Sequence, residues 1–444
     1  TPKPSSAASD VYKRQDVIHE TDVLVVGSGP GGLSAAIASA RCGVKTTLLE
    51  RFGCFGGNIT VVGVEGFAWY RHEKTVEAGG IGREFEELAK EMGAAVPESQ
   101  SLSYELDSEG FKLVADKLVM DSGIHPMLHR SFSMPIMEGN TIIGVIVESK
   151  AGREAILSKV VIDATGDADV AFRAGAQLNT MPVEELMATS VMFHLAGVDK
   201  KAFLSEIQNN PQSYKDWSDS EWEVETDGKE DDLFSPFIKK PFQQAINDGL
   251  LPSDLKTIGG TWGAVHDTGE LTYMNIIQLS NIDGTNPDDL TRGEIEGRKQ
   301  AMLAIEALKK YYPGCEKARL RNFGMSIGIR DTRKLDAVYN MTELDVRKQG
   351  KFEDTIGIYP EFIDGYGLLI LPTTGRYMEL PYSAMLPKNI NGLLVTGRAT
   401  GGDKISHAAT RNMSCCSVNG HCLLYTSDAA DEGLGVDLGG RRII

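Results

Sequence analysis

Six consecutive residues near the N-terminus have the types and spacing that bind a phosphate. In Gly27-Ser28-Gly29-Pro30-Gly31-Gly32, glycine stands at the first, third and sixth positions. The first glycine permits a tight turn, the second lets a pyrophosphate approach the backbone, and the third lets a helix pack closely on a strand. Further along, Glu50 supplies a carboxylate that can accept hydrogen bonds from ribose hydroxyls. These residues predict a dinucleotide site.

The segments around this turn predict the elements that position it. Thr21 to Val26 is a β-branched run typical of a buried parallel strand, and Leu33 to Arg41 is rich in alanine and predicts a helix that ends at Gly43. Val44 to Glu50 predicts the second strand. The helix then directs its free N–H groups at the phosphates. Glycines alone also mark plain turns, but the strand, turn, helix, strand and acidic end together favour a nucleotide site.

Three later segments repeat the pattern of a strand or turn that ends in glycine. They are Arg51 to Thr60 with Gly56, Gly57 and Asn58; Lys159 to Asp169 with Thr165, Gly166 and Asp167; and Asn391 to Arg398 with Gly397. A helix is predicted to start near Asn412 after the last of them. For Lys159 to Asp169 taken alone, an ordinary strand-to-turn transition is the alternative. Together they suit a cofactor domain built from separate stretches of chain.

With the blocks Gly79–Glu84, Asn281–Arg298, Ser326–Lys334 and Leu380–Lys388, these segments resemble the FAD-dependent oxidoreductases of the glutathione-reductase-like superfamily. The resemblance implies an α/β fold: a Rossmann-like FAD-binding domain, discontinuous in sequence, with an inserted α+β substrate domain. It also implies FAD as the cofactor. The residues expected to contact FAD are Gly27, Ser28, Gly29, Pro30, Gly31, Gly32, Glu50, Arg51, Gly56, Gly57, Asn58, Thr165, Gly166, Asp167, Gly397, Arg398 and Asn412.

The expected domain order places the FAD-binding domain at residues 16–177 and 376–421, with the substrate domain at 178–375 between them. Ser5–Gln15 resembles a translated transposase-type sequencing adapter, and Cys422–Glu432 resembles its reverse complement. We therefore expect residues 1–15 and 422–444 to be adapter-derived tails on a gene fragment whose last FAD segment is truncated. Native disordered tails are the alternative.

Three residues are candidates for catalysis beside the flavin. His407 follows the third FAD segment, and its reference pKa suits proton transfer near neutrality. Arg330 and Arg333 stand in a block rich in Gly, Ser and Thr, where guanidinium groups can clamp a carboxylate or phosphate. The alternatives, weighed as equal, are a histidine that satisfies a loop carbonyl and arginines that form salt bridges between domains.

The cysteines do not favour a redox or metal role. Disulfide reductases of the superfamily carry a CxxxxC pattern after the first unit, whereas this chain has Cys54 and Ile59 at those positions. The adjacent Cys415 and Cys416 stand at a predicted helix start, where packing is favoured over a reactive thiol. With 6 cysteines and no CxxC pair, neither a disulfide framework nor a metal is expected.

The net charge and the apolar runs of the chain limit the kinds of partner that it can bind. A formal net charge of -17 argues against a nucleic-acid or anionic-membrane surface. Since no apolar run reaches the roughly 18 residues that span a bilayer, and no secretory signal is present, a cytoplasmic location is expected. The sequence leaves the oligomeric state open.

The function predicted from these features is an FAD-dependent oxidoreductase acting on a small, anionic organic substrate. No second strand–GxGxxG–helix unit follows the first, so no dedicated NAD(P)H domain is expected. Electrons then pass between an organic substrate and a protein, quinone or O2 partner. The alternative is a flavoprotein subunit or FAD-binding scaffold of a larger complex. A third possibility is a tRNA-modifying or thiazole-forming relative. Such proteins share the first motif, but they do not share the later blocks.

Overall fold

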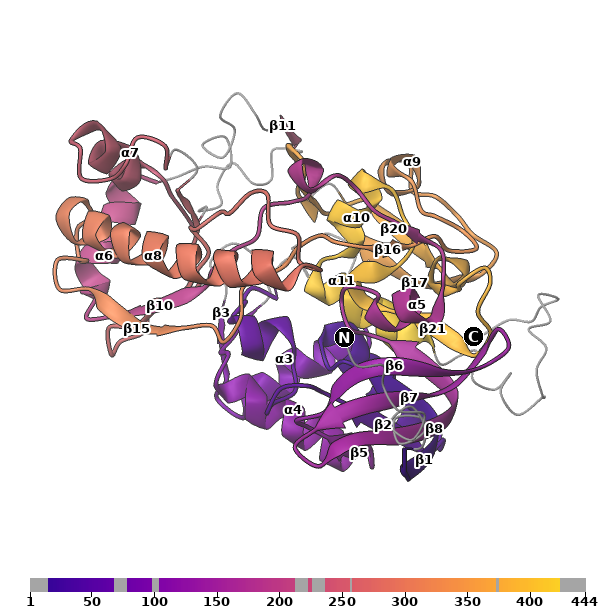
Figure 1. The fold of residues 1–444 in the computed structure, drawn as a ribbon. Helices are drawn as coiled ribbons and strands as arrows, with labels where there is room; N and C mark the ends of the chain where they lie inside the picture. The colour runs from indigo at the N-terminus through magenta and orange to yellow at the C-terminus, as the bar shows by residue number, and fades with distance from the viewer. Residues whose placement is uncertain are drawn as a thin grey trace, which may run out of the picture.

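A seven-stranded sheet lies at the centre of the part that contains the glycine turn (Figure 1). Its order is β5-β2-β1-β8-β7-β6, and β21 joins β8 beside the end of β7. Strands β5, β2, β1, β8 and β21 run parallel, and β7 and β6 are antiparallel. The strands are β1 Val17–Val26, β2 Thr46–Leu49, β5 His125–Met127, β6 Ser131–Glu138, β7 Thr141–Ser149, β8 Gly152–Asp163 and β21 Leu393–Val395. A parallel sheet fed from distant segments confirms the predicted Rossmann-like, discontinuous α/β fold.

This computed structural model describes residues 15–67, 78–97, 104–211, 223–225, 236–255, 258–372 and 375–423. The two tails expected from the sequence therefore lie outside the described residues, apart from Gln15, Cys422 and Leu423. In the described part, no helix combines the length and apolar character needed to cross a bilayer.

The first βαβ unit matches its prediction with small shifts at the boundaries. Strand β1 extends to Val17 on the N-terminal side, and helix α2, Pro30–Arg41, starts before the predicted Leu33. Proline is well placed in a first helical turn, because its missing N–H has no partner there in any case. Gly43 follows the helix with φ +86°, a left-handed conformation that favours glycine.

The two faces of the sheet are buried under different layers. Val23 and Val25 of β1 point into a core shared with helices, while Leu24 and Val26 point into a second core on the opposite face. The helices of the first core are α2, α3 Ile81–Glu91, α4 Gly110–Asp121 and α11 Met413–Cys422. Strands β6 and β7 and helix α5, Asp169–Ala174, contribute to the second. Successive side chains of β1 point to opposite faces of the sheet, so Val23 and Val25 define the face that the helices cover.

A second lobe, seen on the left of Figure 1, has its own core, built from residues between Val191 and Ile327. Its three-stranded sheet has the order β14-β10-β15, and helix α8 runs along it. The elements are β10 Phe193–Ala196, α6 Lys200–Asn209, β12 Phe237–Ile238, α7 Lys240–Asn247, β13 Gly260–Thr261, β14 Leu271–Met274, α8 Pro287–Tyr311 and β15 Arg319–Phe323. This lobe mixes helices and strands and lies within the range 178–375 expected for the substrate domain.

The end of the insertion differs from the expected residue 375. Residues Met341 to Met385 pack into the same core as α2 and α11, so the packing places the end of the second lobe nearer to Ile327. The elements of this stretch are β16 Lys334–Leu335, α9 Glu343–Arg347, β17 Thr355–Pro360, β18 Ile363–Gly365, β19 Leu368–Ile370, β20 Tyr377–Pro381 and η5 Tyr382–Met385. The apolar pattern of a segment shows which of its residues are buried but not which core they join, so the sequence carried no signal for the boundary.

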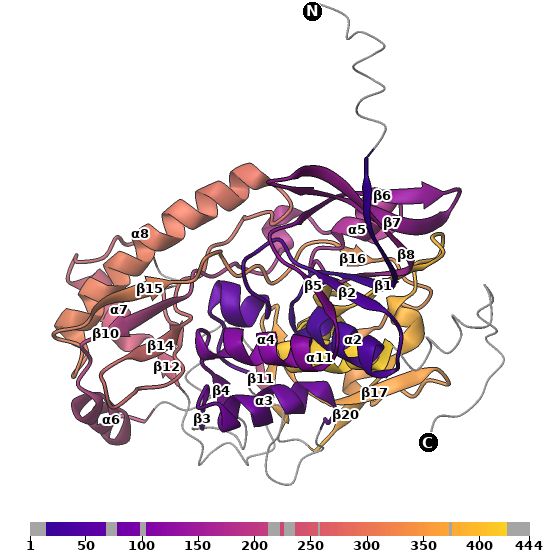
Figure 2. The ribbon, with the colours of Figure 1, turned by 90° about the horizontal axis from the view of Figure 1, so that it is seen from below.

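Short elements connect these parts. They are η1 Asn58–Val62, β3 Ala95–Pro97, β4 Tyr104–Leu106, β9 Leu178–Asn179, η2 Val183–Glu185, β11 Glu223–Glu225, η6 Gly397–Ala399 and α10 Lys404–Thr410. Figure 2 shows α2, α4 and α11 side by side beneath the sheet.

Candidate functional site

The predicted phosphate turn joins β1 to α2 and leaves its backbone bare. Gly27 has φ +102°, and a Cβ there would lie 2.4 Å from the carbonyl oxygen of Ala164 at the end of β8. Gly29 is the N-cap of α2, whose first turn has no side-chain cap and no acidic residue. The first N–H groups of the helix are therefore free to bind an anion.

Glu50 stands where the second strand ends and ties that strand to the turn. Its Oε2 accepts hydrogen bonds from the backbone N of Ser28 at 3.0 Å and from the Ser28 hydroxyl at 2.6 Å. Its Oε1 accepts the N–H of Phe52 at 3.0 Å. Because an ionised carboxylate offers about four acceptor positions, this buried side chain retains capacity for a further donor such as a ribose hydroxyl.

Glycines bring the distant segments into contact with the turn. The N–H of Gly56 donates to the carbonyl of Ser28 at 3.0 Å, and a Cβ on Gly57 would lie 2.5 Å from the Cα of Gly29. A Cβ on Gly31 would lie 2.9 Å from the backbone N of Gly397. The first turn, the glycine pair after β2 and the turn after β21 thus form one backbone-lined cradle, which only residues without side chains permit.

Two predicted residues of the glycine-pair segment lie at its ends. The Arg51 guanidinium is exposed and lies 4.8 Å from the ring centre of Phe52. Asn58 opens η1, and its carbonyl accepts the N–H of Val64 at 3.0 Å. Asn58 therefore shapes the backbone that leads away from the cradle.

The second FAD segment is held by a carboxylate that sequence reasoning missed. Asp163 ends β8, and its Oδ1 accepts the N–H and hydroxyl of Thr165 at 3.0 and 2.7 Å, while Oδ2 accepts the N–H of Ala171 at 2.9 Å. Burial raises the pKa of Asp163 to about 6, although these hydrogen bonds act to lower it. The bonds fix the turn in which Gly166 adopts φ +87°. The only sequence signal was an acidic residue two positions before a Thr-Gly step.

Asp167 and Arg398, predicted on separate FAD segments, form an ion pair. Asp167 also accepts the hydroxyl of Thr332 at 2.7 Å, and its carbonyl accepts the Nε of Arg333 at 2.9 Å. A Cβ on Gly166 would lie 2.9 Å from the Arg398 guanidinium. These polar groups therefore bind one another and join the second and third segments to the stretch that follows the second lobe.

Asn412 lies between two helices. As the N-cap residue of α11 it makes no side-chain bond to that helix, and its Nδ2 instead donates to the carbonyls of Ala408 and Ala409 at 3.2 and 2.8 Å. The side chain thus satisfies the end of α10 and leaves the first N–H groups of α11 open. Gly420 packs α11 onto α2, since a Cβ there would lie 2.0 Å from the carbonyl of Gly31.

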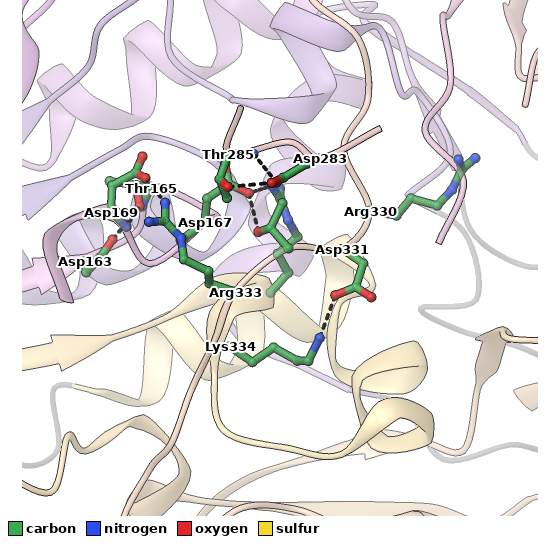
Figure 3. Close-up of polar contacts among 12 residues, drawn as sticks. Asp163, Thr165, Asp167, Asp169, Asp283, Thr285, Arg330, Asp331, Arg333 and Lys334 are labelled. Carbon is green, nitrogen blue, oxygen red and sulfur yellow. Dashed lines mark hydrogen bonds and ion pairs between the residues drawn. The ribbon is translucent and has the colours of Figure 1, made fainter. Parts of the chain in front are cut away.

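Arg330 points away from this cluster, as Figure 3 shows, and is held by neutral oxygens. Its guanidinium donates to the Ala188 carbonyl, to Asn275 Oδ1 at 3.0 Å and to Gln278 Oε1 at 3.4 Å. Among the described residues it forms no ion pair. Burial, followed by the nearby Arg411, lowers the pKa of Arg330 to about 10.

Within the described part of the chain, Arg333, unlike Arg330, is held by an acidic partner. It pairs with Asp169, donates to the Asp167 carbonyl, and lies 4.4 Å from the ring centre of Phe172. All of its contacts reach the segment after β8. The structure thus places Arg330 and Arg333 in different surroundings, although three positions separate them in the sequence.

His407 lies in helix α10, not in a loop, and its ring is 2% exposed. Its Nε2 is 3.1 Å from the carbonyl of Arg330 and 3.5 Å from Asp331 Oδ1. Burial lowers the pKa of His407 to about 3. The ring therefore stays neutral at physiological pH and contacts the backbone carbonyl of Arg330.

This neutral histidine gives a pH prediction. Because the pKa of His407 is about 3 when folded and near 6.5 when unfolded, the unfolded chain binds the extra proton between those values, and stability falls as pH falls through that window. His407→Gln keeps a donor for the carbonyl but cannot be protonated. Urea unfolding at several pH values between about 4.5 and 6 gives the free energy of unfolding as a function of pH. The slope of this free energy against pH should be smaller in the variant by about 1.4 kcal/mol per pH unit. Equal slopes would show that His407 is not held neutral.

The thiols follow the packing interpretation. Cys54 is buried and lies 3.7 Å from the Thr60 hydroxyl, and burial raises its pKa. Burial also raises the pKa of Cys415, and that of Cys416 to about 12. Thiols protonated to this degree are poor nucleophiles at neutral pH.

The fold and the cradle define the class: a Rossmann-like protein whose glycine turn, acidic strand end and open helix N-terminus suit a dinucleotide. Residues 22–423 match the family described as FAD dependent oxidoreductase, and the chain belongs to that family. The cofactor of this family, FAD, is therefore the dinucleotide that the cradle suits.

Curated relatives match over a shorter stretch. The thiamine thiazole synthase of Metallosphaera sedula is 33% identical over 160 residues, which cover 34% of this chain and 55% of that protein. The thiamine thiazole synthase of Saccharolobus solfataricus is 33% identical over 162 residues, 34% of this chain and 57% of that protein. The chain thus spans about half the length of the curated relatives it matches. Among solved structures, a geranylgeranyl bacteriochlorophyll reductase-like protein from Thermoplasma acidophilum is 14% identical, with a TM-score of 0.47, over 93% of this chain and 79% of that one.

Proposed function

We propose that this flavoenzyme oxidises or reduces a small organic anion, which Arg330 holds at the junction of the two lobes. The observation that carries the proposal is a partly buried guanidinium whose partners are a carbonyl and two side-chain amides. A desolvated cation without a paired carboxylate is costly, and a substrate carboxylate or phosphate supplies the missing charge.

The position of Arg330 supports this assignment. Two residues before it, a Cβ on Gly328 would lie 3.1 Å from Val62, the last residue of η1. The turn η1 follows the glycine pair Gly56 and Gly57, so the arginine block lies against the backbone proposed to run along the flavin. His407 acts as a positioning residue, because its ring holds the Arg330 carbonyl.

The residues of the cradle fit FAD in their chemistry. The open N–H groups of α2 suit the pyrophosphate, Glu50 suits a ribose, and the open N-terminus of α11 suits an electron-rich edge of the flavin. When bound, FAD accepts or donates a hydride by its own chemistry. The protein then has to bind the substrate, orient it and exclude water.

Arg330→Lys should weaken binding of the anion. Loss of a planar, multidentate donor costs about 1.5–3 kcal/mol, roughly a 10- to 100-fold rise in the substrate dissociation constant. We expect carboxylates screened anaerobically to bleach the flavin of the wild-type enzyme, with neutral analogues inactive. Arg333→Lys should lower the melting temperature and leave substrate affinity nearly unchanged.

The same anaerobic mixing separates the alternatives. We expect slow bleaching by NADH and NADPH, because the sequence shows no second dinucleotide unit; fast bleaching by either would overturn that expectation. Anions and neutral analogues that act equally would contradict the role of Arg330. A protein that holds FAD yet responds only to a redox protein would support the alternative of a flavoprotein subunit, with a protein or quinone acceptor. A cytoplasmic location stays part of the proposal.

A further inference from the structure

Two titratable side chains face each other in the interior between the lobes, outside the site described above. Glu65 follows η1, and His194 lies in β10 of the second lobe. Their side chains are each 2% exposed, and His194 Nε2 lies 3.9 Å from Glu65 Oε1. This separation is a small side-chain rotation beyond hydrogen-bond distance.

Neither ring nitrogen of His194 has a hydrogen-bond partner among the described residues. Buried polar groups are nearly always satisfied, so an orphaned imidazole beside a carboxyl group calls for an explanation. A histidine kept only for packing would be expected to donate to a nearby carbonyl, as His407 does. The charged or titratable groups that act on the His194 ring are Arg321, Asp107, Glu109, His266 and Glu65.

Glu65 connects this pair to the protein surface. Its Oε1 accepts the N–H of Ser108 at 3.0 Å, and the Thr272 hydroxyl donates to the same carboxylate. Thr272 also lines a polar, solvent-open pocket of about 230 Å³. The other lining residues are Asp107, His266, Thr268, Glu270 and Arg321.

The opposite side of the pair reaches the flavin-binding loop. A Cβ on Gly63, the residue that ends η1, would lie 3.3 Å from His194 Nε2 and 3.8 Å from Met192. The carbonyl of Val61 accepts the N–H of Met325 from the second lobe at 2.7 Å. The pair therefore lies between the pocket and η1, whose place beside the flavin rests on the proposed role of Gly56 and Gly57.

We propose that Glu65 and His194 form a proton relay between the Thr272 pocket and the flavin-binding loop. A pocket water gives a proton to the Thr272 hydroxyl as that hydroxyl gives its own proton to the Glu65 carboxylate, and the hydroxide left behind leaves through the open pocket into the solvent. The Glu65 carboxyl group then passes this proton to Nε2 of His194 beside Gly63. Each transfer breaks one O–H bond and forms one O–H or N–H bond, and no change of oxidation state occurs.

The electrostatic surroundings of Glu65 suit a carboxyl group that gains and loses a proton near neutral pH. Burial raises the pKa of Glu65 to about 7, although Ser108 and Thr272 oppose the shift. Burial lowers the pKa of His194 to about 4, with Arg321 acting in the same direction. Burial thus favours a proton on the carboxyl group over one on the ring, and the carboxyl group gains and loses this proton close to neutral pH.

Infrared and NMR titrations of the FAD-loaded protein test the pair directly. We expect a protonated-carboxyl band that disappears with a midpoint near pH 7 and is absent in Glu65→Gln. The ¹⁵N signals of the His194 ring, assigned by their loss in His194→Asn, should shift with the same midpoint, and this step should vanish in Glu65→Gln. A carboxyl group that ionises below pH 5, or His194 signals indifferent to Glu65, would overturn the proposal.

A matched pair of pocket variants tests the connection to the surface. Thr272→Val removes a donor to the carboxylate and should raise the proton affinity of Glu65 at least threefold, with slower exchange. Thr268→Val changes the same pocket without touching Glu65 and should have no effect. Equal behaviour of the two variants would rule out Thr272 as the link.

The flavin potential tests whether the relay reaches the cofactor. A plot of midpoint potential against pH, measured by dye equilibration, should change slope at the midpoint of the pair, and the change should be lost in Glu65→Gln. A plot unaffected by Glu65→Gln would overturn the coupling. Since these measurements need no substrate, they fail or succeed independently of the proposed anion.

Discussion

Gly29→Ala should give a folded protein that has lost most of its affinity for FAD. Gly29 has φ -61° and ψ 174°, a conformation that alanine adopts freely, and no atom lies within 4 Å of the position its Cβ would take. The added methyl group therefore strains nothing in the chain itself. It occupies the space through which a pyrophosphate approaches the N-terminus of α2.

The effect on the cofactor should be large. Displacing the pyrophosphate from the helix N-terminus removes several charge-assisted hydrogen bonds, for which we expect about a 100-fold loss of affinity, or about 3 kcal/mol. Visible spectra and fluorescence titration with FAD measure this loss, and thermal unfolding of the apoprotein measures the fold. A yellow variant with unchanged affinity would show that the phosphates do not lie at Gly29.

Gly32→Ala is the matched contrast in the same turn. Its Cβ would lie 2.1 Å from the carbonyl oxygen of Gly27, so the turn itself has to move. This variant should lose stability and FAD together, whereas Gly29→Ala separates the two. The comparison distinguishes a glycine required by the ligand from one required by the fold.

The sequence predicted the cradle because its signals are local. The spacing of Gly27, Gly29 and Gly32 and the acidic end at Glu50 follow from backbone chemistry within one βαβ unit. The contacts between Gly31, Gly397 and Gly420 were not predictable in detail, because they depend on how helices from distant segments meet. The glycines in the sequence indicated where backbones could approach closely. Which glycine contacts which segment depends on the three-dimensional fold.

Residues whose role depends on burial were the hardest to assign. Arg330 and Arg333 stand in one block and are indistinguishable by type, yet only Arg330 lacks a carboxylate partner among the described residues. Glu65 and His194 come from different lobes and belong to no motif, so no spacing links them. In both cases the proposed role rests on desolvation and distance, and neither quantity can be read from a sequence pattern.

The junction of the lobes contains the polar network around Asp331, and this network gives the second large prediction. Asp331 pairs with Lys334 at 2.6 Å, accepts the Tyr366 hydroxyl, and lies beside His407. The side chains of Asp331 and Lys334 are 0% and 3% exposed. Burial acts to raise the pKa of Asp331, but the ammonium of Lys334 and the hydroxyl of Tyr366 stabilise the carboxylate, and the pKa lies below its usual value.

Asp331→Asn should destabilise the protein by about 3–5 kcal/mol at neutral pH, because it leaves the buried ammonium of Lys334 without a counter-charge. Urea unfolding measures the change. Asp336→Asn, which removes the partner of Lys388 in a more exposed pair, should have little effect. The double variant Asp331→Asn with Lys334→Met should recover much of the loss, since it removes the buried charge as well as its partner.

The stability difference between wild type and Asp331→Asn should also depend on pH. A carboxyl group with a lowered folded pKa contributes stability that is present above its unfolded pKa and is lost as pH falls through the folded value. The difference between wild type and Asp331→Asn should therefore be full at pH 7 and shrink below about pH 4. A difference that stays constant into acid would assign the loss to packing instead of charge. Because this network supports the backbone that carries Arg330, Asp331→Asn should also weaken substrate binding, and the double variant shows whether stability or position is responsible.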